Sequence, residues 1–159
     1  MSFSVVTEDF WEGVTWPEGH IKAGEPIILR DYQVEVINQF ISKPQCLQEI
    51  ATGAGKTIMT ATMSKVVEKY CRSIIIVPNK DLVRQTEEDY TNCGLDVGVY
   101  FGDKKDHGKT HTICTWQSLN SLLKKTKKGE ANIQEFIEDV CCVIAVSYTH
   151  LTLPTILLV

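Results

Sequence analysis

Apolar residues in the middle of the chain follow two different spacings. Residues 31–42 (DYQVEVINQFIS) carry apolar side chains at helical spacing, and Pro44 closes that segment. Residues 73–77 (SIIIV) and 140–145 (VCCVIA) are continuous apolar runs, which are typical of strands buried on both faces of a parallel sheet. This alternation of strands and helices predicts an α/β fold with a doubly wound, mainly parallel sheet.

Most of the remaining segments continue the alternation. Residues 1–28 are weakly patterned, and they predict an irregular lead-in or the remnant of a preceding domain. Residues 124–132 (KKTKKGEAN) predict a polar, basic connection. The other predicted strands cover residues 46–50, 97–101 and 110–115, and the other predicted helices cover residues 56–70, 80–92 and 116–124.

Composition narrows the class of protein. The 159 residues, 43% hydrophobic and 23% charged, suit one globular domain. The net charge of −4 excludes a protein that grips nucleic acid by bulk positive charge, although it leaves local contacts open. Six cysteines without C-x-x-C spacing predict a reducing cytoplasm and no metal or disulfide framework. No signal peptide and no apolar run of membrane-spanning length are present, so we expect a cytoplasmic protein, in the host cytoplasm if phage-encoded.

The strongest chemical signal is ATGAGKT at residues 51–57. Glycines allow backbone N–H groups to close around phosphate oxygens, and the following helix adds the positive end of its dipole. A lysine in the loop reaches the outer phosphates, and the next hydroxyl can ligate Mg²⁺. The full pattern requires glycine where the chain has Ile50, so a glycine-containing turn without a ligand stays open. The predicted ATP-binding residues of the loop are Thr52, Gly53, Ala54, Gly55, Lys56 and Thr57.

Three further motifs follow in a fixed order. Residues 29–33 read LRDYQ, residues 76–85 read IVPNKDLVRQ, and residues 113–119 read ICTWQSL. Together with the phosphate loop they resemble the first motor lobe of superfamily 2 helicases, in the branch with RecG-like, type I/III restriction and phage UvsW-type helicases. The resemblance covers about residues 28–145 and implies a RecA-like P-loop lobe that uses ATP and Mg²⁺.

The resemblance also implies roles on the nucleotide side. Arg30 and Gln33 correspond to the segment that reads adenine, for which an amide offers a paired donor and acceptor. The alternative is that Tyr32 packs in the core while Gln33 is merely exposed. Lys56 and Thr57 correspond to the catalytic residues of the loop, and Thr57 also corresponds to the metal ligand.

On the nucleic-acid side, the resemblance implies contacts to the phosphate backbone rather than to bases. For residues 78–85 the alternative is a capped amphipathic helix with solvated side chains, and Trp116 is expected to pack in the core or against another lobe. The basic stretch with Lys104, Lys105, His107, Lys109 and His111 favours a solvated loop over added phosphate contacts. The predicted nucleic-acid residues are Pro78, Asn79, Lys80, Gln85, Gly102, Thr115 and Gln117.

The segment after Ala145 departs from the family pattern. Family members carry an acidic box, D-E-x-[HD], due at Val146 and Ser147, but no Asp or Glu follows Asp139. The run VSYTHLTLPT can be translated from DNA that resembles the end of a transposase-based sequencing adapter. We therefore expect residues 29–145 to be a partial lobe truncated before the acidic motif, and residues 146–159 to be a non-native tail that is poorly ordered or aggregation-prone. A genuine divergent terminus is the alternative.

These observations lead to one expected function and several alternatives. The parent protein is expected to be an ATP-dependent helicase or translocase of the phage recombination and repair type, acting on DNA or RNA–DNA duplexes through their phosphate backbone. A second RecA-like lobe is expected elsewhere in the parent chain. Residues 1–159 are expected to hydrolyse no ATP, because the carboxylates that orient water are missing. The alternatives are the motor of a type I/III restriction enzyme and a non-helicase P-loop NTPase.

Overall fold

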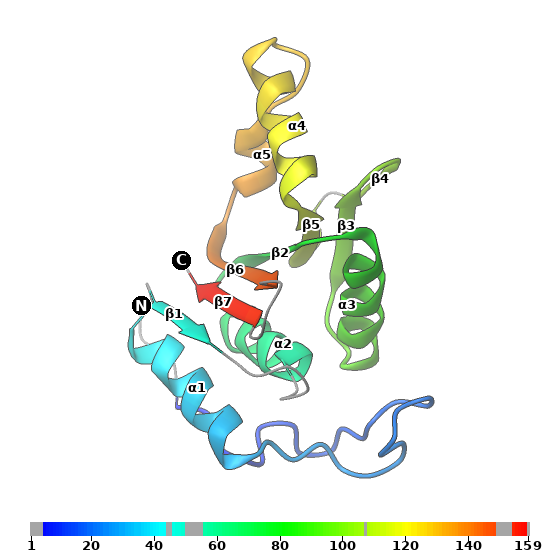
Figure 1. Cartoon of the computed structure of the whole chain (residues 1–159), viewed down its shortest axis with the longest axis vertical. Coiled ribbons are helices and arrows are strands. Elements are labelled where there is room, and N and C mark those ends of the chain that lie inside the picture. Colours follow the sequence, from blue (N-terminus) through cyan, green and yellow to red (C-terminus); the bar gives the residue numbers. More distant parts are fainter. Residues whose placement is uncertain (1–4, 44–45, 50–55, 107, 149–153, 159) are drawn as a thin grey trace.

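The computed structural model describes residues 5–43, 46–49, 56–106, 108–148 and 154–158, which form one sheet with helices on both faces (Figure 1). The helices are α1 (Asp31–Ser42), α2 (Lys56–Val67), α3 (Lys80–Asn92), α4 (Trp116–Lys127) and α5 (Ile133–Ile137). The strands are β1 (Cys46–Glu49), β2 (Arg72–Val77), β3 (Val97–Phe101), β4 (Lys104–Lys105), β5 (His111–Thr115), β6 (Val140–Tyr148) and β7 (Pro154–Leu158). Among these helices, none is long and apolar enough to cross a membrane.

The described strands lie in the order β1-β7-β6-β2-β5-β3-β4. β2 is central and pairs in parallel with β5 and β6, and β3 pairs in parallel with β5. β4 is antiparallel to β3, and β7 is antiparallel to both of its neighbours. The mainly parallel, doubly wound arrangement of the sequence prediction is confirmed.

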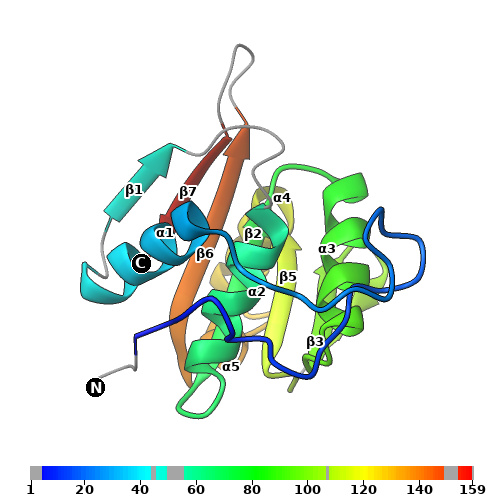
Figure 2. The ribbon, with the colours of Figure 1, turned by 90° about the horizontal axis from the view of Figure 1, so that it is seen from below.

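Alternate residues of the central strand supply two hydrophobic cores. Ile75 and Val77 face a large core that also contains side chains of α1, α2 and α3, and Figure 2 shows these helices in front of the sheet. Ile74 and Ile76 face a smaller core closed by Leu122 of α4 and Phe136 of α5. Because both faces of β2 are covered, its sequence is a continuous apolar run rather than an alternating one.

Residues 5–30 are mostly irregular and pack against the large core. Trp11 is 3% exposed, and its indole Nε1–H donates to Thr62 Oγ1 on α2 at 2.9 Å. The backbone N–H of Val6 donates to Asn38 Oδ1 on α1 at 2.8 Å, and Asn38 Nδ2 donates back to the Val6 carbonyl. Residues 5–30 therefore share the large hydrophobic core with α1 and α2.

Several element boundaries differ from the prediction. α4 runs to Lys127 rather than ending at Lys124, and Thr126 Oγ1 donates to the Leu122 carbonyl inside this added turn. The short elements β4 and α5 were not predicted. Within the tail, Pro154–Leu158 form β7, a strand that was not predicted: the β-branched residues Thr155 and Ile156 favour a strand, and proline is tolerated at its first position. The expectation that the tail is poorly ordered or aggregation-prone stays a prediction.

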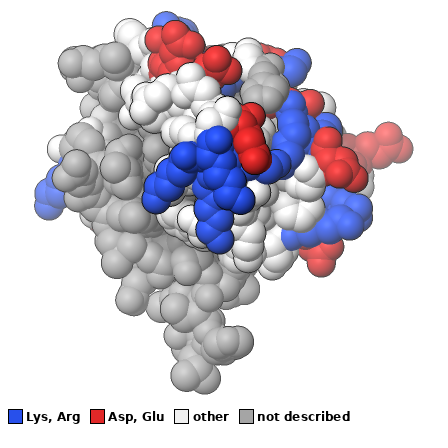
Figure 3. Space-filling view, turned by 90° about the horizontal axis from the view of Figure 1, so that it is seen from above, with Lys and Arg blue, Asp and Glu red and all other residues white. Residues whose placement is uncertain are grey.

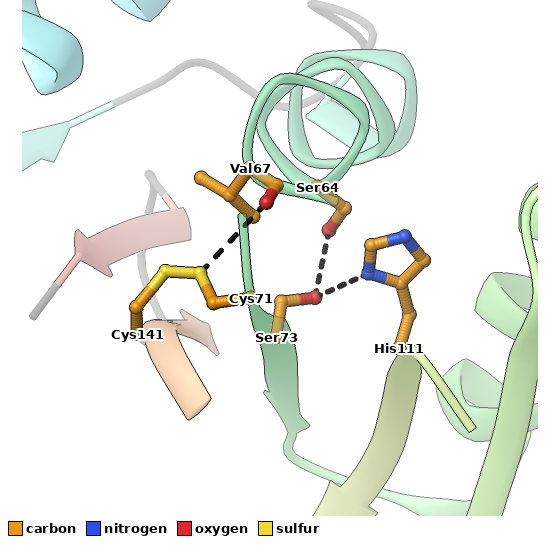
Figure 4. The surroundings of a disulfide bond; sticks show 6 residues. All are labelled: Ser64, Val67, Cys71, Ser73, His111 and Cys141. Carbon is orange, nitrogen blue, oxygen red and sulfur yellow. Dashed lines mark hydrogen bonds between the residues drawn. A yellow bond between two sulfur atoms is a disulfide. The ribbon is translucent and has the colours of Figure 1, made fainter. Parts of the chain in front are cut away.

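A disulfide joins Cys71 and Cys141, which corrects the expectation of no disulfide framework (Figure 4). Their Cα atoms are 5.8 Å apart, within the usual range for a disulfide. Cys71 directly precedes β2, while β6 carries Cys141 as an extra residue, because Arg72 pairs with Val140 and the next residue, Ser73, pairs with Cys142. Cysteine spacing alone could not reveal this pair, since the two residues are 70 positions apart.

Candidate nucleotide and nucleic-acid site

The strand registers bring the predicted motifs to one edge of the sheet. Val77, the last residue of β2, lies opposite Thr115, the last residue of β5. β3 ends beside them, since Tyr100 lies opposite Cys114, and β6 passes on the other side, since Ala145 lies opposite Ile76. The segments that follow β2, β5 and β3 therefore start side by side at the carboxyl edge, where ligands bind in open α/β sheets.

The amino end of α2 reaches the same edge. The helix begins at Lys56, and Thr57 lines a cavity of about 20 Å³ between α2, α3 and the sheet. A space of this size holds about one water molecule. The predicted loop residues Thr52, Gly53, Ala54 and Gly55 lie outside the described residues, as does the side chain of Lys56. The cavity is lined by Thr57, Thr60, Ile75, Val77, Leu82, Thr86 and Val146.

The same cavity tests whether the described residues suit Mg²⁺. Thr57 offers a hydroxyl, but the position at which the helicase resemblance implies a carboxylate is occupied by Val146, which is 8% exposed and part of the large core. None of the described lining residues carries a carboxylate. Protein-bound Mg²⁺ depends on one or two carboxylates besides phosphate oxygens and water. The described donor set therefore does not fit the ion.

The predicted adenine-reading segment is built around the start of α1. Gln33 is 5% exposed, and its Oε1 accepts the backbone N–H of Arg30 at 2.9 Å, closing the first turn of the helix. Tyr32 is 37% exposed, with its hydroxyl 3.4 Å from Arg30 Nη1. The alternative of a buried tyrosine and an exposed glutamine is therefore wrong, while adenine reading by Arg30 and Gln33 stays a prediction.

The segment after β2 presents polar groups at the carboxyl edge. Asn79 caps α3 by accepting the backbone N–H of Leu82 on its Oδ1 at 3.0 Å. Lys80 and Gln85 are exposed, and Pro78 is half-buried. The cap fixes where α3 starts, so the first turn of α3, with Lys80, lies at the same edge as the start of α2. Contact of these four residues with nucleic acid stays a prediction.

The segment after β5 differs residue by residue. Thr115 is 1% exposed, and its Oγ1 accepts the backbone N–H of Ser118 at 3.3 Å, so it serves as the cap of α4. Gln117 is exposed, and Trp116 is 50% exposed, so a core position for this indole is wrong, while packing against another lobe stays a prediction. Gly102, exposed and with φ of 56°, follows β3 at the same edge. The nucleic-acid roles of Gly102, Thr115 and Gln117 stay predictions.

The basic stretch after β3 is partly neutralised. Lys104 Nζ lies 2.6 Å from Glu87 Oε1, and Lys109 Nζ lies 3.4 Å from Asp96 Oδ1. His107 lies outside the described residues. His111 does not belong to an exposed basic loop at all, because it is fully buried at the start of β5.

A buried polar network around His111 was missed by sequence reasoning. Ser73 Oγ lies 2.7 Å from His111 Nδ1 and donates to Ser64 Oγ at 3.3 Å, as Figure 4 shows. Ser64 Oγ lies 2.9 Å from the hydroxyl of Tyr90, and His111 Nε2 lies 3.2 Å from Glu68 Oε2. The network ties α2 and α3 to β2 and β5. In the sequence, Ser64 and Glu68 are four residues apart and therefore share one helix face, and this spacing was the signal that could have indicated the network.

Burial sets the protonation of this network. Burial lowers the pKa of His111, although the Glu68 carboxylate opposes that shift. For Glu68, burial alone would raise the pKa, but hydrogen bonds from Lys65 and His111 outweigh it and the pKa is lowered. Burial also raises the pKa of the Tyr90 hydroxyl far above its usual range. Because the network lies at the opposite end of β2 and β5 from the carboxyl edge, it is structural support and not part of the candidate site.

Comparison with known proteins assigns the family. Residues 26–144 match the family described as type III restriction enzyme, res subunit, which is well over half of the chain. The chain belongs to this family. The match covers the four motifs, and it agrees with the first RecA-like lobe of superfamily 2 helicases that the motifs imply.

Two further proteins are similar to this member of the res-subunit family. The DNA 3'-5' translocase XPB2 of Sulfurisphaera tokodaii is 30% identical over 95 residues, which cover 59% of this chain and 21% of the translocase. The crystal structure of the UvsW helicase from bacteriophage T4 superposes with a TM-score of 0.67 at 14% identity, over 91% of this chain and 51% of that chain. The second likeness shows the RecA-like fold. The chain thus spans a fifth to a half of these relatives.

Proposed function

We propose that this chain is the ATP-binding lobe of a nucleic-acid helicase or translocase. One observation carries the proposal: the registers of β2, β5 and β3 place the starts of α3 and α4 and the residue Gly102 at one sheet edge, and Thr57 at the start of α2 lines a cavity with Val77 at that edge. A nucleotide at the start of α2 and a nucleic-acid phosphate backbone at the starts of α3 and α4 would then lie at the same edge of the sheet. The family membership and the DNA translocase relative support the same proposal.

In this mechanism the chain's own residues bind and orient. The first turn of α2, with Lys56, would hold phosphate oxygens, and Arg30 and Gln33 would hold the base. Asn79, Lys80 and Gln117 would contact the backbone of DNA or of an RNA–DNA duplex without reading its sequence. Bound Mg²⁺ would neutralise phosphate charge in the family's chemistry, but no step of this chain is assigned to it because the described donors do not suit it. A second lobe in the parent protein would complete the site.

We further infer that residues 1–159 bind nucleotide without hydrolysing it. Val146 supports this inference, since a buried hydrocarbon group can neither hold a metal ion nor orient water. The test measures phosphate release by the chain with and without single-stranded and duplex DNA, together with binding of a fluorescent ATP analogue. Binding that Lys56→Ala weakens, without phosphate release, is expected. Turnover that Lys56→Ala abolishes would contradict the inference.

Residues 146–159 form the basis of a separate proposal, namely that they do not belong to the natural lobe. Two observations support it: Val146 replaces the expected carboxylate, and β7 is antiparallel to both neighbours in a mainly parallel sheet. Sequencing an independent clone across the codon for Ala145 tests it. An Asp-Glu pair at positions 146 and 147 is expected. The same VSYTHLTLPT codons in that clone would contradict the proposal that residues 146–159 are not native.

The biological setting has two candidates. The res-subunit family match favours the motor of a restriction enzyme, whereas the residues of the segments IVPNKDLVRQ and THTICTWQSLN favour a phage helicase of the recombination and repair type. The two are distinguished by what the complete gene encodes with the lobe. A nuclease or methyltransferase domain indicates restriction, and branched-DNA unwinding by the complete protein indicates recombination.

A further inference from the structure

The far end of α4 carries a group of lysines that the proposed site does not use. Its last turn contains Lys124, Lys125 and Lys127, and Lys128 is the C-cap. All four are exposed, and Figure 3, viewed from the end where α4 and α5 project, shows Lys and Arg side chains gathered at the centre of this face. Cations at a helix C-terminus are favoured by the helix dipole, so this cluster alone does not define a site.

A second element brings another positive charge to the same place. Lys105 on β4 holds its Nζ 4.3 Å from the centre of the Tyr100 ring. Tyr100 belongs to the same small core as Leu122, which precedes Lys125 by one helical turn. Burial, and then repulsion from Lys125, lower the pKa of Lys105, while Asp103 opposes the shift. The fold therefore holds charges of two separate elements close together.

Ion pairing separates these lysines from their neighbours. Lys104 is paired with Glu87 and Asp106, and Lys109 is paired with Asp96. In the part of the chain that the structure describes, no ion pair involves Lys105, Lys124, Lys125, Lys127 or Lys128. We call these five residues the distal basic surface. Unpaired like charges repel one another, so their natural complement is a polyanion.

The distal basic surface is continuous with the candidate site. Gln117, Ser121, Lys124 and Lys128 are spaced by four, three and four residues along α4 and all are exposed, so they form one stripe. At 1.5 Å per residue the stripe is about 16 Å long. That length matches about five nucleotides of one strand of a duplex, at roughly 3.4 Å each.

We propose that the distal basic surface binds the phosphate backbone of duplex DNA, extending along α4 the contact that begins at Gln117. The inference rests on the proposed function, because it assumes nucleic acid at the carboxyl edge. It adds a contact outside the helicase motifs, on the far end of a helix whose start carries one of them. The contact is electrostatic and independent of base sequence.

The test uses the whole chain and a fluorescently labelled 20-base-pair duplex, with anisotropy measured over a series of salt concentrations. The triple variant Lys124→Gln, Lys125→Gln, Lys128→Gln is compared with a charge-matched control, Lys22→Gln, Lys43→Gln, Lys69→Gln, whose lysines are exposed elsewhere. The slope of log affinity against log salt should fall in magnitude by about 0.9 for each DNA phosphate that the substituted lysines no longer neutralise. The control should bind like the unmodified chain, and a Lys→Arg triple at the distal positions should restore binding.

The outcomes separate the two proposals. If the distal triple binds like the control while Gln117→Ala weakens binding, the distal surface is excluded and the proposed function stands. If the unmodified chain binds no duplex at low salt, both fail. If the distal triple binds less tightly than the control and the arginine triple does not recover, charge is not the cause and the distal proposal is overturned. Thermal unfolding of each variant excludes misfolding as the source of weaker binding.

Discussion

Thr57 and Val146 meet at a cavity of about 20 Å³, and their pairing leads to a prediction at the scale of single residues. Val146→Asp places a carboxylate beside the Thr57 hydroxyl. Without Mg²⁺ the variant should be less stable by about 2–4 kcal/mol, because the new charge is largely buried and no described lining residue is cationic. With Mg²⁺ its affinity for a fluorescent ATP analogue should rise about tenfold, or ~1.4 kcal/mol.

Val146→Asn is the matched control for that experiment, since it has the same shape without the charge. It should lose stability but gain no Mg²⁺ dependence. Equal responses of the two variants to Mg²⁺ would show that the ion is not held at position 146. Nucleotide titrations with Mg²⁺ and with EDTA supply the comparison.

His111 gives a prediction about pH. Its folded-state pKa is lowered from 6.5 by burial, and the charged or titratable groups around it are Glu68, Asp96, Lys65 and Tyr90. The unfolded chain therefore binds the proton more tightly, so stability is present above about pH 6.5 and is lost as the pH falls toward the folded-state value. Urea unfolding between pH 7.5 and 5.5 should show a smaller loss for His111→Gln than for the unmodified chain. If the free energy of unfolding fell equally with pH in both proteins, His111 would not be the group responsible.

Between elements, the Cys71–Cys141 bond links the start of β2 to the start of β6. Closing a loop of 70 residues stabilises a folded chain by roughly 4 kcal/mol in the chain-entropy description. Cys141→Ser should therefore lower the free energy of unfolding under oxidising conditions and leave it nearly unchanged in dithiothreitol. Thiol counting under denaturing conditions checks the pairing directly. With one disulfide, the unmodified, unreduced chain should show four of its six cysteines as reactive thiols, and six reactive thiols would contradict the pairing.

The elements that sequence could predict are those with a strong local pattern. The apolar run of β2 and the helical spacing of α1 and α3 depend on nearby residues alone, and all three appear close to their predicted bounds. The sequence prediction ends α4 too early because the lysines after Leu123 suggest a loop. In the structure these lysines continue the helix, whose buried face is formed by Ser118 and Leu122. β7 was missed because its order depends on two partner strands far away in sequence.

For the whole molecule, the lead-in gives the clearest test of what belongs to the lobe. Trp11 is buried on α2, so Trp11→Ala should cost about 3–5 kcal/mol of stability. Trp11→Phe keeps most of the packing and loses the bond to Thr62, so about 1 kcal/mol is expected. Denaturant titrations of the two variants measure both losses. A negligible effect of Trp11→Ala would mean that residues 5–30 fold apart from the lobe.

The candidate site was predictable in outline for a reason that applies to the whole sheet. Parallel strands place every following loop at one edge, so the order of motifs along the chain implied their meeting at Val77 and Thr115. What could not be predicted is which side chains stay accessible. Thr115 and Gln33 are drawn into caps, whereas Trp116 is left half exposed, and these outcomes depend on helix starts fixed by tertiary packing.

β7 also sets the order in which the molecule can be assembled. In the described sheet β1 is hydrogen-bonded to β7 alone, and β7 in turn joins it to β6. During synthesis the strand that leads into the phosphate loop would therefore wait for β7, while β2, β3, β5 and β6, which precede β7 along the chain, can already pair. Such a delayed, long-range pairing slows folding and leaves an unpaired strand open to other chains.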